Sequence, residues 1–487
     1  MSKHLLSKST FIRSQQCQKS LYLHKKRPFL RDKLSAVQLA KFRRGTGVGV
    51  LARELFPGGI DMSPRSPSQY EQKRNETAEA LSNHEINVLY EAVFQFDDVL
   101  IMLDILVRDG DNWVAYEVKS SRSLSETYMK DAALQHYVLN GCNVKLSDFV
   151  LVYINSDYVF NYELDLNQLF IKRSVLTESE LQAETIGHQI TLSKLTLELS
   201  NSPQLSIGIH CNKPYPCDFI GHCWKNIPSN SILHLTTFDE DLRFKLINQG
   251  INTIDDLPKE MIQNECQQLQ IEALTINEIT YNANKIKVYL NSINSTLKKQ
   301  GSVSLKLLVH RPAVPFIYLT QPYQLLPLAL SIRNNDTNAT ESISFTLDLK
   351  GLEDFSKIMN TIFNENNLVI TDDTDIIMET LFNVQSILSA SFSFSPESAK
   401  EQLIGIHQLI NEGQVFHPVL RNDWNMNDTI LALTGKNNSL KEEVYLINDL
   451  LKADGNEETA RILQRLATYP QAIFQLFEKI QQLQNMK

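Results

Sequence analysis

Three cysteines within thirteen residues constrain this chain more than any other feature of its sequence. Cys211, Cys217 and Cys223 are separated twice by five residues, and Cys17 lies almost two hundred residues earlier. Together they supply four thiolates, which is the ligand set of a cubane iron–sulfur cluster. Zinc uses the same number of ligands, but structural zinc sites favour closely paired Cys-x₂₋₄-Cys knuckles, which this segment lacks. The spacing therefore favours a 4Fe–4S cluster, with zinc as the alternative.

The rest of the composition is that of an intracellular globular protein. The chain has 487 residues and six cysteines, too few for a disulfide scaffold, and Cys142 and Cys266 fit no ligand pattern. No run of eighteen apolar residues occurs, and the first residues lack the long apolar stretch of a secretory signal. We therefore expect a cytoplasmic protein with no membrane partner. Its length predicts two or three domains.

Basic residues are concentrated at the start of the chain. Residues 1–44 contain twelve Lys or Arg and one acidic residue, Asp32, which gives a formal charge of +11. The whole chain carries −9, so the remainder is at −20. A basic segment on an acidic body is typical of a phosphate-binding surface, and it also fits a solvated N-terminal arm. Charge thus allows a nucleic-acid partner but does not by itself require one.

The hydrophobic pattern predicts a mixed α/β fold, because helical spacing and strand-like alternation follow one another along the chain. We expect helices over 34–56, 70–82, 125–139 and 177–200, and strands over 86–94, 99–107, 113–119 and 149–154. The glycines of segment 44–49 predict an interruption of the first helix. Residues 239–300 read as charged helices with breaks at Gly250 and Pro258. The α/β pattern returns at 301 and ends in helix over 457–486.

Two carboxylates and one lysine are expected to meet on neighbouring strands. Asp104 lies on the strand 99–107, while Glu117 and Lys119 share one face of the next strand. Their burial among apolar residues is costly unless a cation compensates. A hard divalent cation such as Mg²⁺ or Mn²⁺ fits these oxygen ligands, and Lys119 can help to activate water or stabilise charge on phosphorus. The alternative is an amphipathic hairpin with surface ion pairs.

The same residues resemble the PD-(D/E)xK core of the RecB nuclease family. Asp104 and the run Glu117-Val118-Lys119 match the motif, and the following helix carries Gln135 and Tyr137, similar to the Gln/Tyr motif of those nucleases. The resemblance implies a restriction-endonuclease-like α/β core. It also implies that Gln135 and Tyr137 position the lysine or the substrate phosphate.

The chain departs from this family upstream of the motif. Many RecB-like nucleases supply a metal-binding His from an early helix, and Gly49 stands where that His would align. Glu91, on the strand before Asp104, is a candidate replacement ligand for the metal.

The cysteine layout is similar to that of the iron–sulfur RecB-like nucleases, which include CRISPR-associated exonucleases. In those proteins one early and three late cysteines join the two ends of the nuclease domain, as Cys17, Cys211, Cys217 and Cys223 would here. The resemblance implies a nuclease domain with an iron–sulfur clasp over 1–230, followed by a helical linker region over 231–300.

Residues 301–487 resemble the DEDD-type, RNase H-like exonuclease domain that an uncharacterised bacterial family joins to such a nuclease. The matching landmarks are Val314-Pro315-Phe316-Ile317, the segment 321–327 and Phe416-His417-Pro418. The resemblance implies that the first strand of this domain runs through 314–321. A DEDD domain needs Asp-x-Glu on that strand, but here the strand continues Tyr318-Leu319-Thr320-Gln321, and no Asp follows Tyr469. Two-metal chemistry requires those carboxylates. We therefore expect a second α/β domain that is degenerate and serves binding or scaffolding.

Taken together, these features favour a metal-dependent deoxyribonuclease. We expect an exonuclease that acts on single strands or ends, and DNA rather than RNA as its substrate. Protein partners would bind through 301–487. The alternative is a non-catalytic nucleic-acid-binding or scaffold protein built from two lapsed nuclease domains. Asp104, Glu117 and Lys119 favour the nuclease, whereas Gly49 and the degenerate third favour the scaffold.

Overall fold

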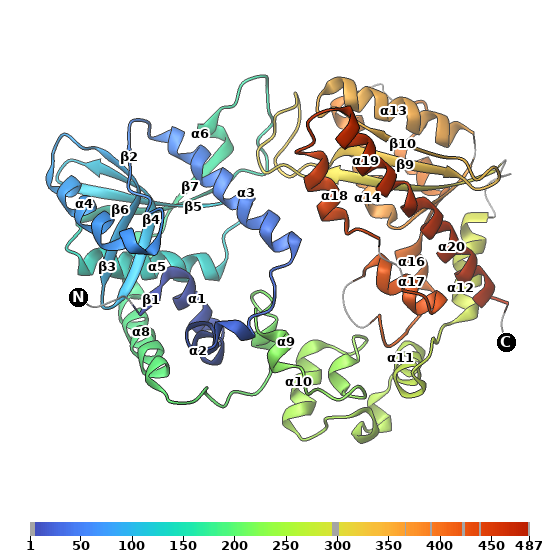
Figure 1. Cartoon of the computed structure of the whole chain (residues 1–487), viewed down its shortest axis with the longest axis horizontal. Helices are drawn as coiled ribbons and strands as arrows, with labels where there is room; N and C mark the ends of the chain where they lie inside the picture. Colours follow the sequence, from blue (N-terminus) through green and yellow to red (C-terminus); the bar gives the residue numbers. More distant parts are fainter. Residues whose placement is uncertain are drawn as a thin grey trace. The chain divides into compact units, whose positions relative to one another are not determined.

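The structure, a computed structural model, describes residues 5–294, 301–365, 367–389, 392–420, 424–437 and 440–485. The chain divides into two compact units, residues 1–226 and 227–487. Each unit contains a mixed β-sheet with helices packed against it, which confirms the expected α/β class (Figure 1). Within the described ranges we find no helix with the length and apolar character needed to cross a membrane.

The first unit is built on a seven-stranded sheet within its described residues. The strands are β1 (Leu6–Ser7), β2 (Ile60–Asp61), β3 (Val88–Phe96), β4 (Val99–Asp109), β5 (Asn112–Lys119), β6 (Leu146–Ile154) and β7 (Phe170–Ser174). β3, β4 and β5 form an antiparallel meander, β6 joins β5 in parallel, and β7 pairs antiparallel with β6. The short strands β1 and β2 run parallel to β4 and β3. The strands expected from the sequence are confirmed.

A tight turn sets the register of β4 and β5. Asp109 pairs with Asn112, so the turn consists of Gly110 and Asp111, and Gly110 has a φ of 60° that glycine adopts without steric cost. Counting back from this turn, the pairing continues to Ile105 opposite Tyr116. Asp104 and Glu117 are the next residues on the two strands, so the turn determines that they meet.

Helices cover the sheet of the first unit. They are α1 (Lys8–Gln16), α2 (Gln18–Lys26), α3 (Ala36–Ala52), α4 (Tyr70–Ser82), α5 (Glu126–Gly141), α6 (Leu166–Leu169), α7 (Leu176–Leu181), α8 (Ala183–Glu198) and α9 (Ile220–Cys223). α5 is the crossover between the parallel strands β5 and β6. Its Ala132, Leu134 and Leu139 belong to one fully buried cluster with Leu103 and Ala115 of the sheet. Each such leucine stabilises the fold by about 1.5–3 kcal/mol.

The predicted interruption of the first helix is wrong, because α3 runs unbroken from Ala36 to Ala52 through its three glycines. Each glycine in a helix interior costs about 1 kcal/mol relative to alanine. The helix begins with a capping box between Ser35 and Gln38, and it buries Val48 and Ala52. These contributions offset the cost of the glycines.

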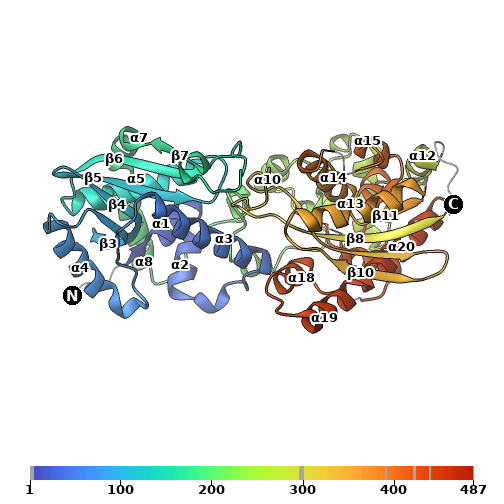
Figure 2. The ribbon, with the colours of Figure 1, turned by 90° about the horizontal axis from the view of Figure 1, so that it is seen from above.

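The second unit contains a five-stranded sheet among its described residues, in the order β10-β9-β8-β11-β12. Its strands are β8 (Ser302–His310), β9 (Leu326–Asn334), β10 (Thr340–Ser344), β11 (Leu368–Thr371) and β12 (Leu403–Gly405). β8, β9 and β10 form an antiparallel meander, while β11 runs parallel to both β8 and β12. Figure 2 shows this sheet between α13 (Leu349–Asn364) and α14 (Thr374–Ile387) on one side and α18 (Glu443–Leu450), α19 (Asn456–Leu466) and α20 (Thr468–Leu483) on the other.

The helices expected over 239–300 lie in this second unit. They are α10 (Glu240–Asn248), α11 (Glu265–Ile276) and α12 (Ala283–Asn294), and further helices are α15 (Pro396–Lys400), α16 (Ile406–Glu412) and α17 (Met426–Thr434). The break at Gly250 is confirmed, with φ of 88° after the end of α10. Residues 295–300 and 486 of the expected helical regions lie outside the described residues.

The prediction of a strand through 314–321 is wrong. The first strand of the second sheet is β8, and the segment from 311 to 325 contains turns and no strand. Pro312, Pro315 and Pro322 lack the amide hydrogen that a sheet needs, and Leu319 and Tyr323 have positive φ. The carboxylates of a first strand must therefore be sought on β8 instead.

Candidate active site and four-cysteine pocket

Glu117 lies at the centre of a buried ionic cluster at the end of β5. Alternation along β5 turns Trp113 and Ala115 into the core beneath α5, so Glu117 and Lys119 face the same helix. The Glu117 residue is 2% exposed. Lys119 Nζ donates to its Oε1 at 2.7 Å, and Gln135 Nε2 donates to its Oε2 at 2.9 Å. The fold thus brings together Glu117, Lys119 and Gln135, which the sequence had singled out.

Asp104 and Glu91 face each other across an irregularity in the pairing of β3 and β4. The residues on either side of them are paired, but these two are not, and Glu91 has a φ of 51°. A left-handed conformation costs a non-glycine residue on the order of 1 kcal/mol and is common at functional sites. Asp104 Oδ2 accepts a hydrogen bond from the Val118 amide at 2.7 Å, and Glu91 Oε1 accepts one from Arg53 at 3.1 Å. Asp104 therefore stands beside Glu117, while Glu91, opposite Asp104, is bonded to Arg53.

The acids of this cluster differ in their protonation equilibria. Burial, reinforced by the negative charge of Glu117, raises the pKa of Asp104 to about 7. Burial also disfavours charge on Glu117, but the ammonium groups of Lys119 and Lys8 outweigh it and hold the pKa of Glu117 well below its usual range. Burial likewise disfavours the charged form of Lys119, yet Asp131 and Glu117 hold its pKa above the ordinary value. Lys119 is therefore a protonated donor at neutral pH.

Two members of the cluster were not anticipated from the sequence. Lys8 Nζ lies 2.7 Å from Glu117 Oε1 and 3.9 Å from Asp131 Oδ2, and Lys119 also forms an ion pair with Asp131. Asp131 lies four residues before Gln135, hence on the same helix face, and this spacing could have revealed it. Lys8 is 109 residues from Glu117 in the sequence, and no local pattern marks it.

Tyr137 does not join this cluster. Tyr137 is two residues after Gln135, and successive residues are about 100° apart around a helix, so the two side chains lie on different faces of α5. Its hydroxyl donates to Asp97 Oδ2 at 3.3 Å, and its ring lies 5.6 Å from that of Phe96. The structure therefore separates the two halves of the expected Gln/Tyr motif.

Gly49 does not contact the end of β5. A Cβ atom on Gly49 would have no heavy atom within 4 Å, whereas one on Gly45 would lie 3.8 Å from Oγ of Ser120, the residue after Lys119. The helix α3 thus passes the site at Gly45, one turn before the position at which the sequence placed the missing histidine.

The donor set of this cluster suits a hard cation. Asp104, Glu91, Glu117 and Asp131 are oxygen donors, and two buried oxygens, Asp131 Oδ1 and Gln135 Oε1, accept no hydrogen bond within the described residues. Leaving such a group unsatisfied costs about 1–3 kcal/mol. No three His, Cys, Asp or Glu side chains in the described part of the chain are gathered closely enough to hold a single metal ion. The ammonium groups of Lys8 and Lys119 stand among the carboxylates instead.

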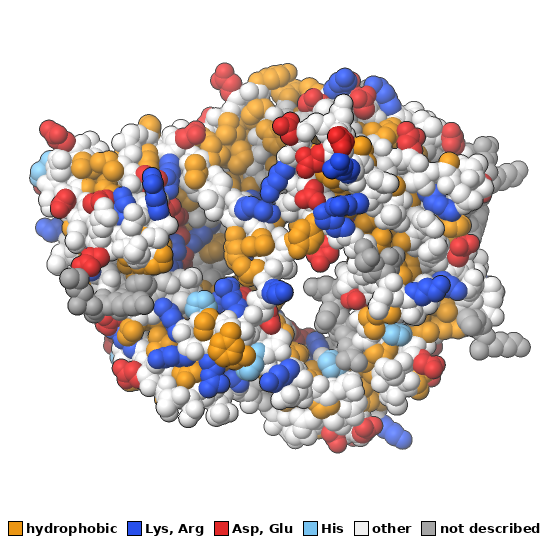
Figure 3. All heavy atoms as spheres, viewed as in Figure 1, with side chains coloured by type: hydrophobic (Ala, Val, Ile, Leu, Met, Phe, Trp, Pro, Cys, Tyr) orange, Lys and Arg blue, Asp and Glu red, His pale blue; other side chains and the backbone are white. Residues whose placement is uncertain are grey.

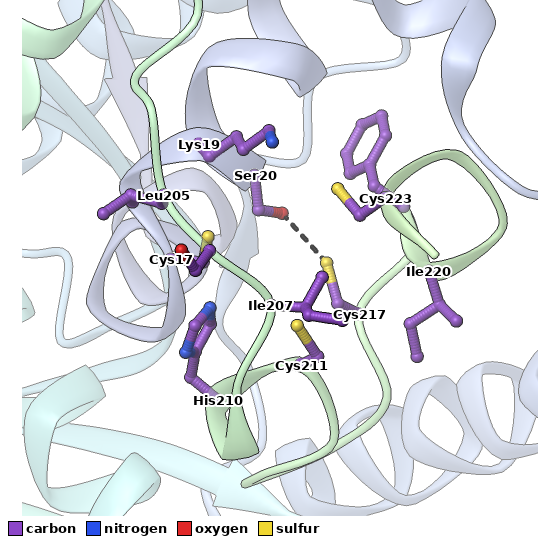
Figure 4. Close-up of a pocket in the computed structure, with 12 residues that line it drawn as sticks. Cys17, Lys19, Ser20, Leu205, Ile207, His210, Cys211, Cys217, Ile220 and Cys223 are labelled. Atoms are coloured by element: carbon purple, nitrogen blue, oxygen red, sulfur yellow. Dashed lines mark hydrogen bonds between the residues drawn. The ribbon is translucent and has the colours of Figure 1, made fainter. Parts of the chain in front are cut away.

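Cys17, Cys211, Cys217 and Cys223 line one small pocket (Figure 4). Cys17 ends α1, Cys211 ends a short 3-10 turn, and Cys223 ends α9. Burial raises the thiol pKa of Cys17 and of Cys223, and the neighbouring cysteines raise it further. Thiols whose ionisation is opposed in the way seen for Cys17 and Cys223 need a bound cation to become thiolates. Four thiols are the donor types of a thiolate-bound metal centre, but no three of them in the described part of the chain are gathered closely enough to hold one metal ion.

Contacts independent of the thiols also join the two ends of the first unit. Asp218 Oδ2 binds Arg13 at 2.7 Å and Arg31 at 2.6 Å. Gln16 Nε2 donates to the carbonyl oxygens of His210 and Tyr215 at 2.8 and 2.7 Å. The start of the chain and the cysteine segment are thus held side by side, as the four-cysteine hypothesis requires.

Basic side chains of the N-terminal segment remain at the surface. Lys25, Lys26 and Arg27 at the end of α2 are exposed, as are Lys33 and Lys41. Figure 3 shows Lys and Arg side chains gathered around α2 on this face of the first unit. Part of the +11 segment is therefore placed where it can meet an anionic partner, while Lys8 and Arg13 serve internal ion pairs.

The second unit has a buried ionic cluster of its own. Lys306, in the middle of β8, pairs with Asp372, the residue after β11, and its Nζ lies 2.6 Å from Glu443 Oε1 at the start of α18. The ring centroid of Tyr469 lies 5.7 Å from the same ammonium. The side chains of Lys306 and Asp372 are 5% and 8% exposed. No Asp or Glu occurs on β8, so a lysine occupies the strand from which a carboxylate would be expected.

Comparison with models of known protein families found no match to this sequence, and comparison with curated protein sequences found none either.

Proposed function

We propose that the first unit is a metal-dependent nuclease of the RecB-like PD-(D/E)xK type that cleaves DNA from single strands or ends. The observation that carries this proposal is the convergence of Asp104, Glu117 and Lys119 with Gln135 beneath α5. The order of elements supports it: an antiparallel meander β3–β4–β5, a crossover helix, and a parallel strand β6. The four cysteines support a cluster of the 4Fe–4S type that joins the ends of this unit.

The chemistry follows from the charges of the site. Asp104 and Glu117, with Glu91 beside them, would hold Mg²⁺ or Mn²⁺, which when bound supplies a polarised phosphate and a water of lowered pKa. Lys119 is held protonated by Asp131 and Glu117, so it stabilises negative charge on the phosphate rather than removing a proton from water. Gln135 fixes the Glu117 carboxylate by donating to Oε2.

Replacement of the acids tests the proposal. Glu117→Ala and Asp104→Ala are each expected to abolish Mg²⁺- or Mn²⁺-dependent cleavage of labelled DNA, because each removes a hard oxygen ligand. Lys119→Ala is expected to abolish cleavage while Mn²⁺ still binds, since it removes charge stabilisation and no ligand. DNA binding should persist in all three and weaken with salt. A wild-type protein that binds DNA but cleaves neither single strands, duplexes nor RNA would overturn the nuclease and favour the scaffold alternative.

The two residues of the Gln/Tyr pair should behave differently. Gln135→Ala is expected to lower the cleavage rate by about 10- to 100-fold, because outer contacts that orient a metal ligand typically contribute this much. Tyr137→Phe keeps the ring and removes only the hydroxyl that bonds Asp97, so its cleavage rate should match the wild type. Rate constants at saturating Mg²⁺ for both variants measure the difference. Equal losses would show that Tyr137 acts in the site despite its position.

For the second unit we propose a degenerate, RNase H-like domain that binds or scaffolds. The strand order with a central β8 flanked by β9 and β11 supports the relationship. Lys306 on β8 supports the loss of chemistry, because an ammonium in that position repels a divalent cation. Deleting residues 301–487 should therefore leave metal-dependent cleavage detectable and alter affinity or partner choice.

A further inference from the structure

The side chain of Lys8 competes for the atom that a metal ion would need. Glu117 Oε1 accepts hydrogen bonds from Lys8 and from Lys119, each at 2.7 Å. Its other oxygen is occupied by Gln135. Of these three donors, Lys119 and Gln135 lie on β5 and α5, the elements that build the site. Lys8 lies near the N-terminus, more than one hundred residues earlier in the sequence.

The position of Lys8 is fixed by the fold rather than by chance contact. Strand β1 pairs with the start of β4, whereas β5 pairs with β4 only from Ile105 onward. The helix α1 begins at Lys8, directly after β1. The other end of α1 is anchored, because Arg13 binds Asp218 and Gln16 donates to two carbonyl groups of the cysteine segment. The backbone at Lys8 is therefore held next to Glu117.

The ammonium group itself can leave. The Lys8 side chain is 29% exposed, against 13% for Lys119, and it ends a flexible four-carbon stem. Lys119 is further held by Asp131 and lies over the Tyr128 ring, with 5.0 Å between Nζ and the ring centroid. Of the two lysines on Glu117, Lys8 is the more exposed and the one whose ammonium has access to solvent.

We propose that Lys8 is a removable counter-ion of the active site, which a divalent cation must displace from Glu117 and which thereby sets the metal concentration at which the site fills. The inference rests on the proposed nuclease function, since it concerns the cation of that site. It makes Lys8 a positioning residue: it orients Glu117 by donating to Oε1, and it yields to the metal. Charge is what matters, because an ammonium and a divalent cation repel each other over a few ångströms in a partly buried site.

Mn²⁺ affinity of the full-length protein, measured by titration calorimetry, tests the role of Lys8. Lys8→Met is expected to bind Mn²⁺ at least about tenfold more tightly than wild type, because it removes the competing charge and keeps the stem. Lys8→Gln, which can still donate to Glu117, should show the same direction, and Lys8→Arg should stay close to wild type. Lys130→Met is the matched control, because Lys130 lies on α5 but pairs with exposed Glu126.

The outcomes separate this inference from the function on which it rests. Equal or weaker Mn²⁺ binding by both Lys8→Met and Lys8→Gln would overturn the role of Lys8, whatever the nuclease does. The expected ranking of affinities without any cleavage would support Lys8 and overturn the nuclease. Absence of Mn²⁺ binding in wild type and variants alike would overturn both.

Discussion

Lys306→Met is expected to lower the free energy of unfolding of the second unit by about 3–5 kcal/mol, which is the usual cost of removing one partner of a buried ion pair. The ammonium of Lys306 lies between Asp372 and Glu443, and its side chain is 5% exposed. Methionine fills a similar volume but leaves the Asp372 carboxylate buried without a cation. The cost is electrostatic rather than steric, and it destabilises β8, the central strand of the second sheet.

Urea-induced unfolding, followed by hydrogen exchange of peptides from β8 and β11, measures this loss in the full-length protein. Lys357→Met is the matched control, because Lys357 pairs with Asp354 at 2.9 Å while both side chains are largely exposed. That change should alter stability by no more than about 0.5 kcal/mol. Adding Asp372→Asn to Lys306→Met should recover part of the loss. A Lys306→Met loss no larger than that of the control would show that the buried cluster contributes little.

Elements whose pattern is local were predicted well. The strands before residue 120 are confirmed because apolar alternation and a Gly-containing turn specify a hairpin directly. The errors arose where a residue's local preference was overruled or overlooked. Helix α3 keeps its three glycines because capping and burial outweigh them, and segment 314–321 is no strand because prolines interrupt it.

The candidate site was predictable only in the part that one hairpin and one helix supply. Glu117, Lys119 and Asp104 follow from strand alternation, and Asp131 from helical spacing with Gln135. Lys8 reaches the cluster through a two-residue strand, β1, whose pairing with β4 has no sequence signature. Lys306 did leave a signal, since it is the single charge in the segment 302–309, but its two acidic partners are 66 and 137 residues away.

Cys17→Ser and Cys217→Ser are expected to cause equal losses of iron and of soluble protein, the largest losses expected for any change in the first unit. Wild-type protein purified without oxygen should be brown, with about four irons per chain and absorbance near 400 nm, as a cubane cluster implies. Metal binding to such a site contributes on the order of 10 kcal/mol to folding, which is comparable to the whole stability of a domain. Both variants should therefore lose iron and most soluble protein.

Remote position is what makes Cys17 informative. It is almost two hundred residues from the other three cysteines, yet it lines the same pocket and ends the helix that carries Lys8. If Cys17 is a ligand, its loss removes the metal link between the two ends of the unit. Cys142→Ser and Cys266→Ser, by contrast, should retain iron, colour and yield. Colourless wild-type protein with one zinc per chain would show that the four cysteines bind zinc rather than an iron–sulfur cluster. Full iron content in Cys17→Ser would remove Cys17 from the ligand set, and the ion pairs of Asp218 and the hydrogen bonds of Gln16 would then join the ends of the unit without it.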